Sequence, residues 1–303
     1  MDIYDRLGVR KAISCCGTFT ILGGALMDPR VLDAMKEAAR SHVLLEDLQD
    51  KAGRYVAELI GVEAAFITTG AAGGLFLATA ALLAGADQAK MQQLPDTAGM
   101  KNEVVICKCQ RFGFDHAVRA VGAKLIEIGD GQTTEPWQME AAIGERTAFG
   151  LWVAELNEDA ALPFEVFRDV AHAHGLPVVV DNAAEVPPVA NLRRFSDLGA
   201  DLVVFSGGKG IRGPQATGLI VGRRDLIAAC RANSSPHEWV IGRPLKVGKE
   251  EIRGFVAALD LYVREISLHE REIWERMVAH IVKQLQGIPY VKAWRHFPYR
   301  PSR

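Results

Sequence analysis

Short apolar runs alternate along the middle of the chain with longer segments in which apolar residues recur every three or four positions. The apolar runs predict strands in AAFITT, EVVICK, KLIEIG, LWVAEL, LPVVVDN, DLVVFSGG and TGLIVG. The segments between them predict helices, among them AAGGLFLATAALLAG and FEVFRDVAHAHG. Strands that are apolar along nearly their whole length and are separated by helices suit a parallel sheet with both faces covered. We therefore predict an α/β fold with a mainly parallel sheet covered by helices.

The two ends of the chain have a different pattern. Residues 1–30 carry Gly17, Gly23 and Gly24, which predicts an N-terminal arm outside the sheet. Residues 31–250 contain the alternating strands and helices and form the predicted large domain. A long amphipathic helix begins near residue 251, and only about 20 residues follow it, fewer than a separate core requires. We expect residues 251–303 to form this linking helix and the start of an incomplete small domain.

The composition limits the classes of function. The 303 residues are 49% hydrophobic and 24% charged, which suits a folded chain with one large core. The formal net charge of -2 provides no basic field for a polyanion, so we expect no nucleic-acid partner. We also expect no membrane association, because no apolar segment approaches a span and the first residues lack the order of a signal peptide. The odd number of cysteines, 5, without C-x-x-C spacing predicts a cytoplasmic protein without a metal site.

The junction in ITTGAAGG is a candidate phosphate site. An apolar strand ends there and a helix begins at once, so the helix N-terminus offers N–H groups and positive dipole charge. The small residues Gly70, Ala71 and Ala72 would let a phosphate approach the main chain. A tight turn that binds nothing explains the same residues.

A carboxylate follows the buried strand in VVVDNAAE. Ligands of open α/β sheets bind outside the carboxyl ends of the strands, so Asp181 is placed to face such a crevice. A buried carboxylate is costly without a cationic partner. The alternative is that Asp181 caps a helix that begins in the next residues.

A lysine follows the next strand, between glycines. Gly208 and Gly210 leave Lys209 accessible in SGGKGIRGPQATG, and a desolvated lysine can supply a neutral amine for a Schiff base. The alternative is a solvated surface lysine. The glycine spacing also fits a dinucleotide fingerprint, but Pro214 and a further strand follow where that motif needs a helix.

Together the three places supply what pyridoxal 5'-phosphate (PLP) needs: a phosphate site at a helix start, an acid for the ring nitrogen and a lysine amine. Gly70, Asp181 and Lys209 occur in the order found in fold-type I PLP enzymes, which the chain resembles. The segments LGVRKAISCCGTFTILGGALMDPRVLDAM, SGGKGIRGPQATGLIVGRRDLI and IGRPLKVGKEEI are similar to the selenocysteine synthase-like group. That group contains the seryl-tRNA(Sec) selenium transferases and the D-glucosaminate-6-phosphate ammonia-lyases.

The resemblance implies a role for each site residue. Lys209 is the implied Schiff-base lysine and Asp181 the implied partner of the pyridinium nitrogen. The implied phosphate ligands are Gly70, Ala71, Ala72 and Ser206. The group that faces the cofactor ring is expected in CQRFGFDH, where Gln110, Phe112 and Phe114 are the alternatives.

The implied activity is that of a PLP-dependent lyase or transferase acting on an amino acid or amino sugar acid. Elimination that releases ammonia is favoured, because the chain lacks the extra N-terminal domain with which the selenium transferases bind tRNA. Selenium transfer, racemisation, transamination and a truncated protein without activity are the alternatives. For the anionic group of a small-molecule substrate the candidates are Arg111, Arg212, Arg243 and Lys246. The resemblance also implies a homo-oligomer.

Overall fold

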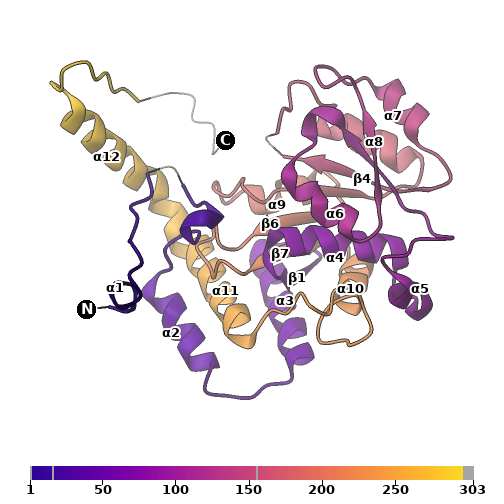
Figure 1. Cartoon of the computed structure of the whole chain (residues 1–303), viewed down its shortest axis with the longest axis horizontal. Coiled ribbons are helices and arrows are strands. Elements are labelled where there is room, and N and C mark those ends of the chain that lie inside the picture. Colours follow the sequence, from indigo (N-terminus) through magenta and orange to yellow (C-terminus); the bar gives the residue numbers. More distant parts are fainter. Residues whose placement is uncertain (1, 16, 155, 296–303) are drawn as a thin grey trace.

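The computed structural model describes residues 2–15, 17–154 and 156–295. The described part contains a seven-stranded sheet in the order β1-β7-β6-β5-β4-β2-β3 (Figure 1). Strand β7 is antiparallel to both of its neighbours, and all other adjacent pairs are parallel, so the prediction of a mainly parallel sheet is confirmed. The strands are β1 (Ala64–Thr68), β2 (Glu103–Cys107), β3 (Lys124–Ile128), β4 (Thr147–Val153), β5 (Val178–Asp181), β6 (Leu202–Ser206) and β7 (Gly218–Gly222).

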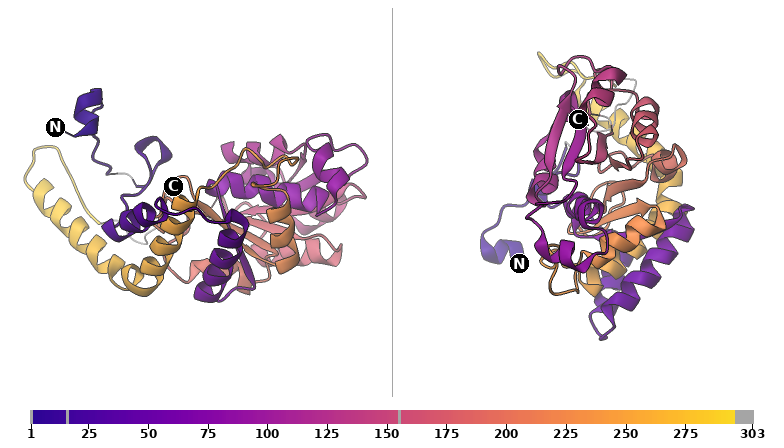
Figure 2. Two further views of the ribbon diagram at one scale, coloured as in Figure 1. Left: turned by 90° about the horizontal axis from the view of Figure 1, so that it is seen from below. Right: turned by 90° about the vertical axis from the view of Figure 1, so that its right-hand side faces the viewer.

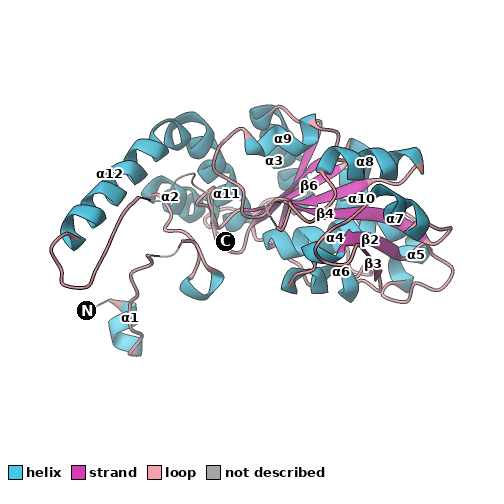
Figure 3. Cartoon of the chain, turned by 90° about the horizontal axis from the view of Figure 1, so that it is seen from above, coloured by secondary structure: helices cyan, strands magenta, loops and turns pink. Residues whose placement is uncertain are grey.

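Helices cover both faces of the sheet (Figure 3). One face packs against α4 (Gly70–Ala84), with α5 (Gln88–Gln93), α6 (His116–Ala120) and α10 (Arg224–Ala232) around it. The other face packs against α3 (Leu45–Ile60), α7 (Pro136–Ala142), α8 (Phe164–Ala173) and α9 (Asn191–Asp197). Each face buries its own apolar core, which explains why the strands are apolar on both sides.

A long helical rod follows the sheet. It consists of α11 (Lys249–Leu261), a π-helical turn η4 (Tyr262–Ile266) and α12 (Ser267–Leu285). Helix α11 packs against α2 (Pro29–Ala38) and α3, whereas α12 projects away from the sheet. The sequence predicts one uninterrupted helix here, and the structure differs by the π turn, which takes up an extra residue while the rod continues. Both predicted domain boundaries, near residues 30 and 250, fall inside helices.

The N-terminal arm reaches the loop that follows β6. The arm contains α1 (Ile3–Leu7) and the 3₁₀ turn η1 (Thr20–Leu22). Gln215 Nε2 donates to the Thr20 carbonyl at 2.9 Å, and the Ala25 N–H donates to the Gly208 carbonyl at 2.9 Å. Figure 2 shows that the arm and α12 extend from the same end of the molecule. Nowhere in the described residues is there a helix with the length and apolar character needed to cross a membrane.

The register of the sheet aligns the strand ends that carry candidate residues. Thr68 at the end of β1 pairs with Gly218 at the start of β7, and Gly218 pairs with Ser206 at the end of β6. Asp181 at the end of β5 pairs with Val153 at the end of β4. The predicted phosphate site, lysine and acid therefore lie together at the carboxyl ends of the parallel strands, which we call the carboxyl edge of the sheet.

Candidate active site

The residues predicted to bind a phosphate lie at the start of α4. Its N-cap residue Thr69 makes no side-chain hydrogen bond to the helix, so the side chain leaves the N–H groups of the first turn to other acceptors. Gly70 has a φ of 69°, a conformation that favours glycine. A β-carbon at Gly218 would overlap the main chain of Gly70, so the adjacent strand needs a glycine as well. Gly70 and Ala71 are half-buried and Ala72 is exposed, which suits an anion bound at the end of the helix dipole.

Asp181 is a buried acid, with 5% of its surface exposed. Its Oδ1 accepts a hydrogen bond from the Ala183 N–H at 3.1 Å, and no cation lies within ion-pair distance of it in the described part of the chain. Burial raises the pKa of Asp181 to about 6, although the Ala183 N–H and the charge of Lys209 both lower it. The alternative that Asp181 caps a helix is wrong, because the next helix in the described chain, α9, begins only at Asn191.

Lys209 lies in the turn after β6, where glycines allow close packing. A β-carbon at Gly208 would overlap the main chain of Gln215, and one at Gly210 would overlap that of Val186. Lys209 is half-buried, and its amine forms no hydrogen bond or ion pair with the described residues. Because its charge acts on Asp181, the amine and the acid share one region of the molecule.

Ser206 lies between these features. It is the last residue of β6 and is half-buried, and its register partner Gly218 packs against the start of α4. The structure therefore brings Gly70, Ser206, Lys209 and Asp181 to the same edge of the sheet.

The segment after β2 contains the candidates for the ring-facing group. Gln110 is fully buried, and its amide exchanges two hydrogen bonds with the main chain of Val153, at 2.7 and 3.2 Å. Phe112 is half-buried and contacts Phe114 edge to face, with the ring centroids 5.9 Å apart, whereas Phe114 is exposed. Gln110 thus fixes the end of β4 beside Asp181. Which of Gln110, Phe112 and Phe114 faces the cofactor ring stays a prediction.

The candidates for the substrate anion differ in what they already bind. Arg111 is paired with Asp115 and Glu127 and so is committed to the protein. Arg243 is half-buried and Lys246 exposed, in a loop whose Gly242 packs against α4, and neither side chain is paired with a described residue.

Arg212 has a partner that the sequence analysis missed. Its Nη2 donates to Glu270 Oε1 at 2.9 Å, and Glu270 is 3% exposed. Tyr262 is fully buried beside this pair: burial and the charge of Glu270 raise the pKa of its hydroxyl, whereas the charge of Arg212 lowers it. A glutamate and a tyrosine in the long amphipathic helix gave no local signal, because the contact spans 58 positions of the chain.

The sheet order, the helices on both faces and the groups at the strand ends define the fold of the fold-type I PLP-dependent enzymes. A family model described as "SelA: L-seryl-tRNA selenium transferase" matches residues 13–288. The chain belongs to this family of enzymes, whose members use PLP.

Three curated relatives have different activities. A D-glucosaminate-6-phosphate ammonia lyase from Salmonella typhimurium (strain 14028s / SGSC 2262) is 37% identical over 86% of this chain and 70% of its own length. A 5'-C-glycyluridine monooxygenase-decarboxylase from Streptomyces sp is 38% identical over 86% of this chain and 65% of its length. An L-seryl-tRNA(Sec) selenium transferase from Rhizobium meliloti (strain 1021) is 30% identical over 86% of this chain and 58% of its length.

Solved structures agree with these relatives. The structure of D-glucosaminate-6-phosphate ammonia-lyase superposes with a TM-score of 0.83, at 33% identity, over 97% of this chain and 80% of that one. Helicobacter pylori PseC, an aminotransferase, superposes with a TM-score of 0.56 at 15% identity, which shows the shared fold alone.

Proposed function

We propose that this chain is a PLP-dependent lyase that releases ammonia from an amino acid or amino sugar acid by α,β-elimination. The observation that carries the proposal is the placement of an unpaired lysine amine, a buried acid and an uncapped helix start along one edge of the sheet. The similarity to the Salmonella ammonia lyase supports the reaction class.

The residues present fit the cofactor. The N–H groups at the start of α4, with Ser206, would hold its phosphate, because an uncapped helix N-terminus attracts an anion. Asp181 would contact the pyridine nitrogen, which gives this buried carboxyl group the cationic partner that it lacks within the described chain. Lys209 would hold the cofactor through its amine, which is not engaged elsewhere in the described chain.

Each residue then has a defined task. When bound, PLP accepts the negative charge that develops on the substrate carbon next to the amino group. Asp181 would hold a proton at the ring nitrogen, since a carboxylate beside a nitrogen favours its charged form. Once the amino group of the substrate has replaced it on the cofactor, the free Lys209 amine would take the proton from the substrate carbon as a general base. Loss of the leaving group from the next carbon, followed by hydrolysis, would release ammonia and a keto acid.

The experiment measures both products. We would incubate the PLP-loaded protein with D-glucosaminate 6-phosphate and with a panel of hydroxylated amino acids, and quantify ammonia and keto acid. We expect equal amounts of the two from at least one substrate, and neither from Lys209→Ala. Lys51→Ala, which removes an exposed lysine of α3, is the matched control. No ammonia from any substrate, despite bound PLP, would contradict the lyase proposal.

The similarity to the Streptomyces monooxygenase-decarboxylase favours a second candidate activity. Oxygen uptake with release of carbon dioxide, in place of ammonia, would identify it, so both gases are measured in the same incubations. We do not propose selenium transfer, because the net charge of -2 provides no field for a tRNA.

We further propose a small-molecule substrate, a cytoplasmic location and a homo-oligomeric state. Size-exclusion chromatography with light scattering tests the last of these. A monomer at micromolar concentration would contradict it.

A further inference from the structure

The ion pair between Arg212 and Glu270 joins the active-site turn to α12. The Arg212 N–H donates to the Lys209 carbonyl at 2.9 Å, so the guanidinium extends from the turn that carries the amine. Arg212 has a φ of 60°, an uncommon conformation for a residue with a side chain. Such residues cost free energy and cluster at sites where their geometry is used.

The guanidinium is only partly committed to this pair. Its Nη2 donates to Glu270, whereas Nε and Nη1 make no hydrogen bond with the described residues. The Arg212 side chain is 36% exposed and that of Glu270 is 4% exposed. The buried carboxylate of Glu270 therefore holds one side of the planar guanidinium group. The remaining N–H groups of Arg212 suit a carboxylate or phosphate of a bound ligand.

The π turn accounts for the position of Glu270. Each residue of a regular α-helix turns about 100°, so Tyr262 and Glu270, eight positions apart, would lie roughly 80° apart around the axis. Because the π turn takes up one extra residue, the rotation between the two residues is that of only seven α-helical positions. This places their side chains within about 20° of each other around the axis. Both side chains consequently lie on the buried side of the rod.

A purely structural pair would be expected to use both oxygens of the buried carboxylate. Glu270 Oε2 and the Tyr262 hydroxyl are buried without a hydrogen-bond partner among the described residues. Buried ion pairs contribute little net stability, because desolvation of the two charges offsets their attraction. The cost of burying Glu270 is easier to explain if it orients Arg212 for a ligand.

We propose that Glu270 is a positioning residue, which orients Arg212 to bind the anionic group of the substrate, a carboxylate or a phosphate, next to Lys209. This inference rests on the proposed function for the identity of the substrate. Arg212 would contact the anionic group of the substrate, and Glu270 would act by holding the Arg212 side chain in place.

The test compares Glu270→Gln with wild type, both loaded with PLP so that the phosphate site at α4 is filled. Calorimetric titration with acetate and with inorganic phosphate measures anion binding without turnover. Loss of the charged partner should weaken binding of the recognised anion about tenfold, the effect of losing roughly 1.4 kcal/mol. The anion that responds identifies the recognised group of the substrate. KM should rise by a similar factor, with kcat changed less than about twofold.

The matched control is Glu275→Gln, which breaks another ion pair of α12, with Arg295, and should change neither constant. In an Arg212→Gln background, Glu270→Gln should have no further effect on KM. If Glu270→Gln does not fold, Glu270→Asp replaces it, since the shorter side chain withdraws the carboxylate and should weaken anion binding similarly.

Wild-type anion affinity and KM in a folded Glu270 variant would overturn the proposal, as would an additive effect in the double variant. Failure of the lyase proposal is distinguishable, because it would appear as absence of ammonia from wild type while the anion titrations still compare the variants.

Discussion

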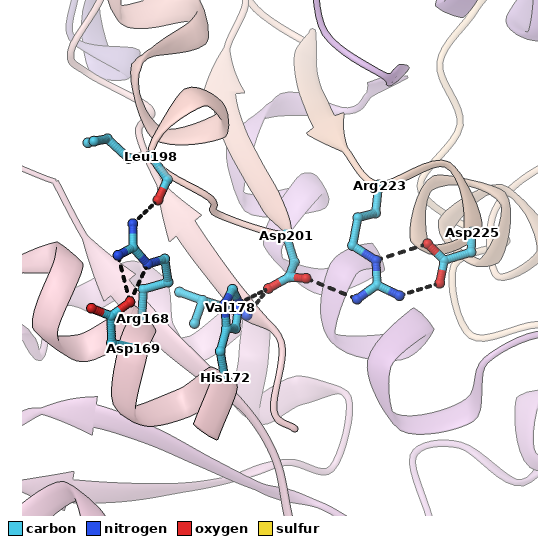
Figure 4. A network of polar contacts seen from close by, with 8 residues as sticks. All are labelled: Arg168, Asp169, His172, Val178, Leu198, Asp201, Arg223 and Asp225. Carbon is cyan, nitrogen blue, oxygen red and sulfur yellow. Dashed lines mark hydrogen bonds and ion pairs between the residues drawn. The ribbon is translucent and has the colours of Figure 1, made fainter. Parts of the chain in front are cut away.

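Two buried aspartates lie at opposite ends of the strands of one sheet, and their carboxylates have different hydrogen-bond partners. Asp201, just before β6, accepts hydrogen bonds from the Val178 N–H at 2.8 Å and from Arg223 Nη1 at 3.0 Å, and it lies 2.9 Å from His172 Nε2 (Figure 4). Asp181, at the end of β5, accepts from one main-chain N–H and has no paired cation among the described residues. The described residues thus supply three polar partners to the carboxylate of Asp201 and one to that of Asp181.

The surroundings of Asp201 extend this contrast. Arg223 also binds Asp225, at 2.6 Å, and so crosslinks β7 and α10 to the start of β6 (Figure 4). At this amino edge the charged groups hold secondary-structure elements together. At the carboxyl ends of the parallel strands, the Lys209 amine and Asp181 form no ion pair with the described residues. We therefore expect a structural role for Asp201, whereas the binding role of Asp181 stays our proposal.

The largest expected effect comes from Asp181→Asn. The amide cannot hold a proton at the ring nitrogen, so kcat should fall by roughly two decades or more, the usual cost of removing a preorganised charge from an active site. The folded state should lose no stability, because the carboxylate is poorly compensated in the protein alone. Steady-state kinetics and thermal unfolding measure the two effects. A variant with wild-type kcat would remove Asp181 from the mechanism.

Asp201→Ala should give the opposite result. It leaves the buried Val178 N–H without its acceptor and removes one of the two carboxylates that bind Arg223. The free energy of unfolding should therefore fall by roughly 3 kcal/mol, the upper end of the cost of an unsatisfied buried donor. In the folded fraction kcat should stay within a few-fold of wild type, since the residue lies at the far edge of the sheet. Urea titration followed by assay below the transition checks both values. Loss of kcat at unchanged stability would contradict a structural role for Asp201.

The smallest effect is a pH dependence of stability in the protein without cofactor. Burial raises the pKa of Asp181 from 3.8 to about 6, so the folded state prefers the protonated acid. This contribution is fully present below pH 3.8 and is lost as the pH rises through about 6. The stability of Asp181→Asn relative to wild type should therefore increase across this window, by up to about 3 kcal/mol. A difference that is constant from pH 4 to pH 7 would contradict the shift.

Much of the fold could be predicted, because the signals are local. The apolar runs that predict β5 and β6 are followed directly by Asp181 and Lys209, so the strand pattern and the chemistry occur together in the sequence. Parallel pairing then brings the strand ends to one edge. The antiparallel direction of β7 gave no such signal, because pairing direction depends on the path of the connecting chain.

Two features of the site depend on tertiary packing and were not predictable. The Gln110 amide forms hydrogen bonds with the main chain of β4, 43 positions away. The residues around Gln110, just after β2, do not indicate this distant partner. The contact of Arg212 with Glu270 depends on the π turn, and the apolar periodicity of the helix predicts an uninterrupted rod. Sequence therefore identified the residues that follow strands and missed the partners that hold them.

Borohydride reduction of the PLP-loaded protein, followed by peptide mapping, tests whether Lys209 holds the cofactor. We expect a visible absorption band that reduction removes, and a pyridoxyl group on Lys209 alone. Asp181→Asn should still be labelled, whereas Lys209→Ala should not. A pyridoxyl group on another lysine, or no labelling with excess PLP, would contradict the assignment of this edge of the sheet as the active site.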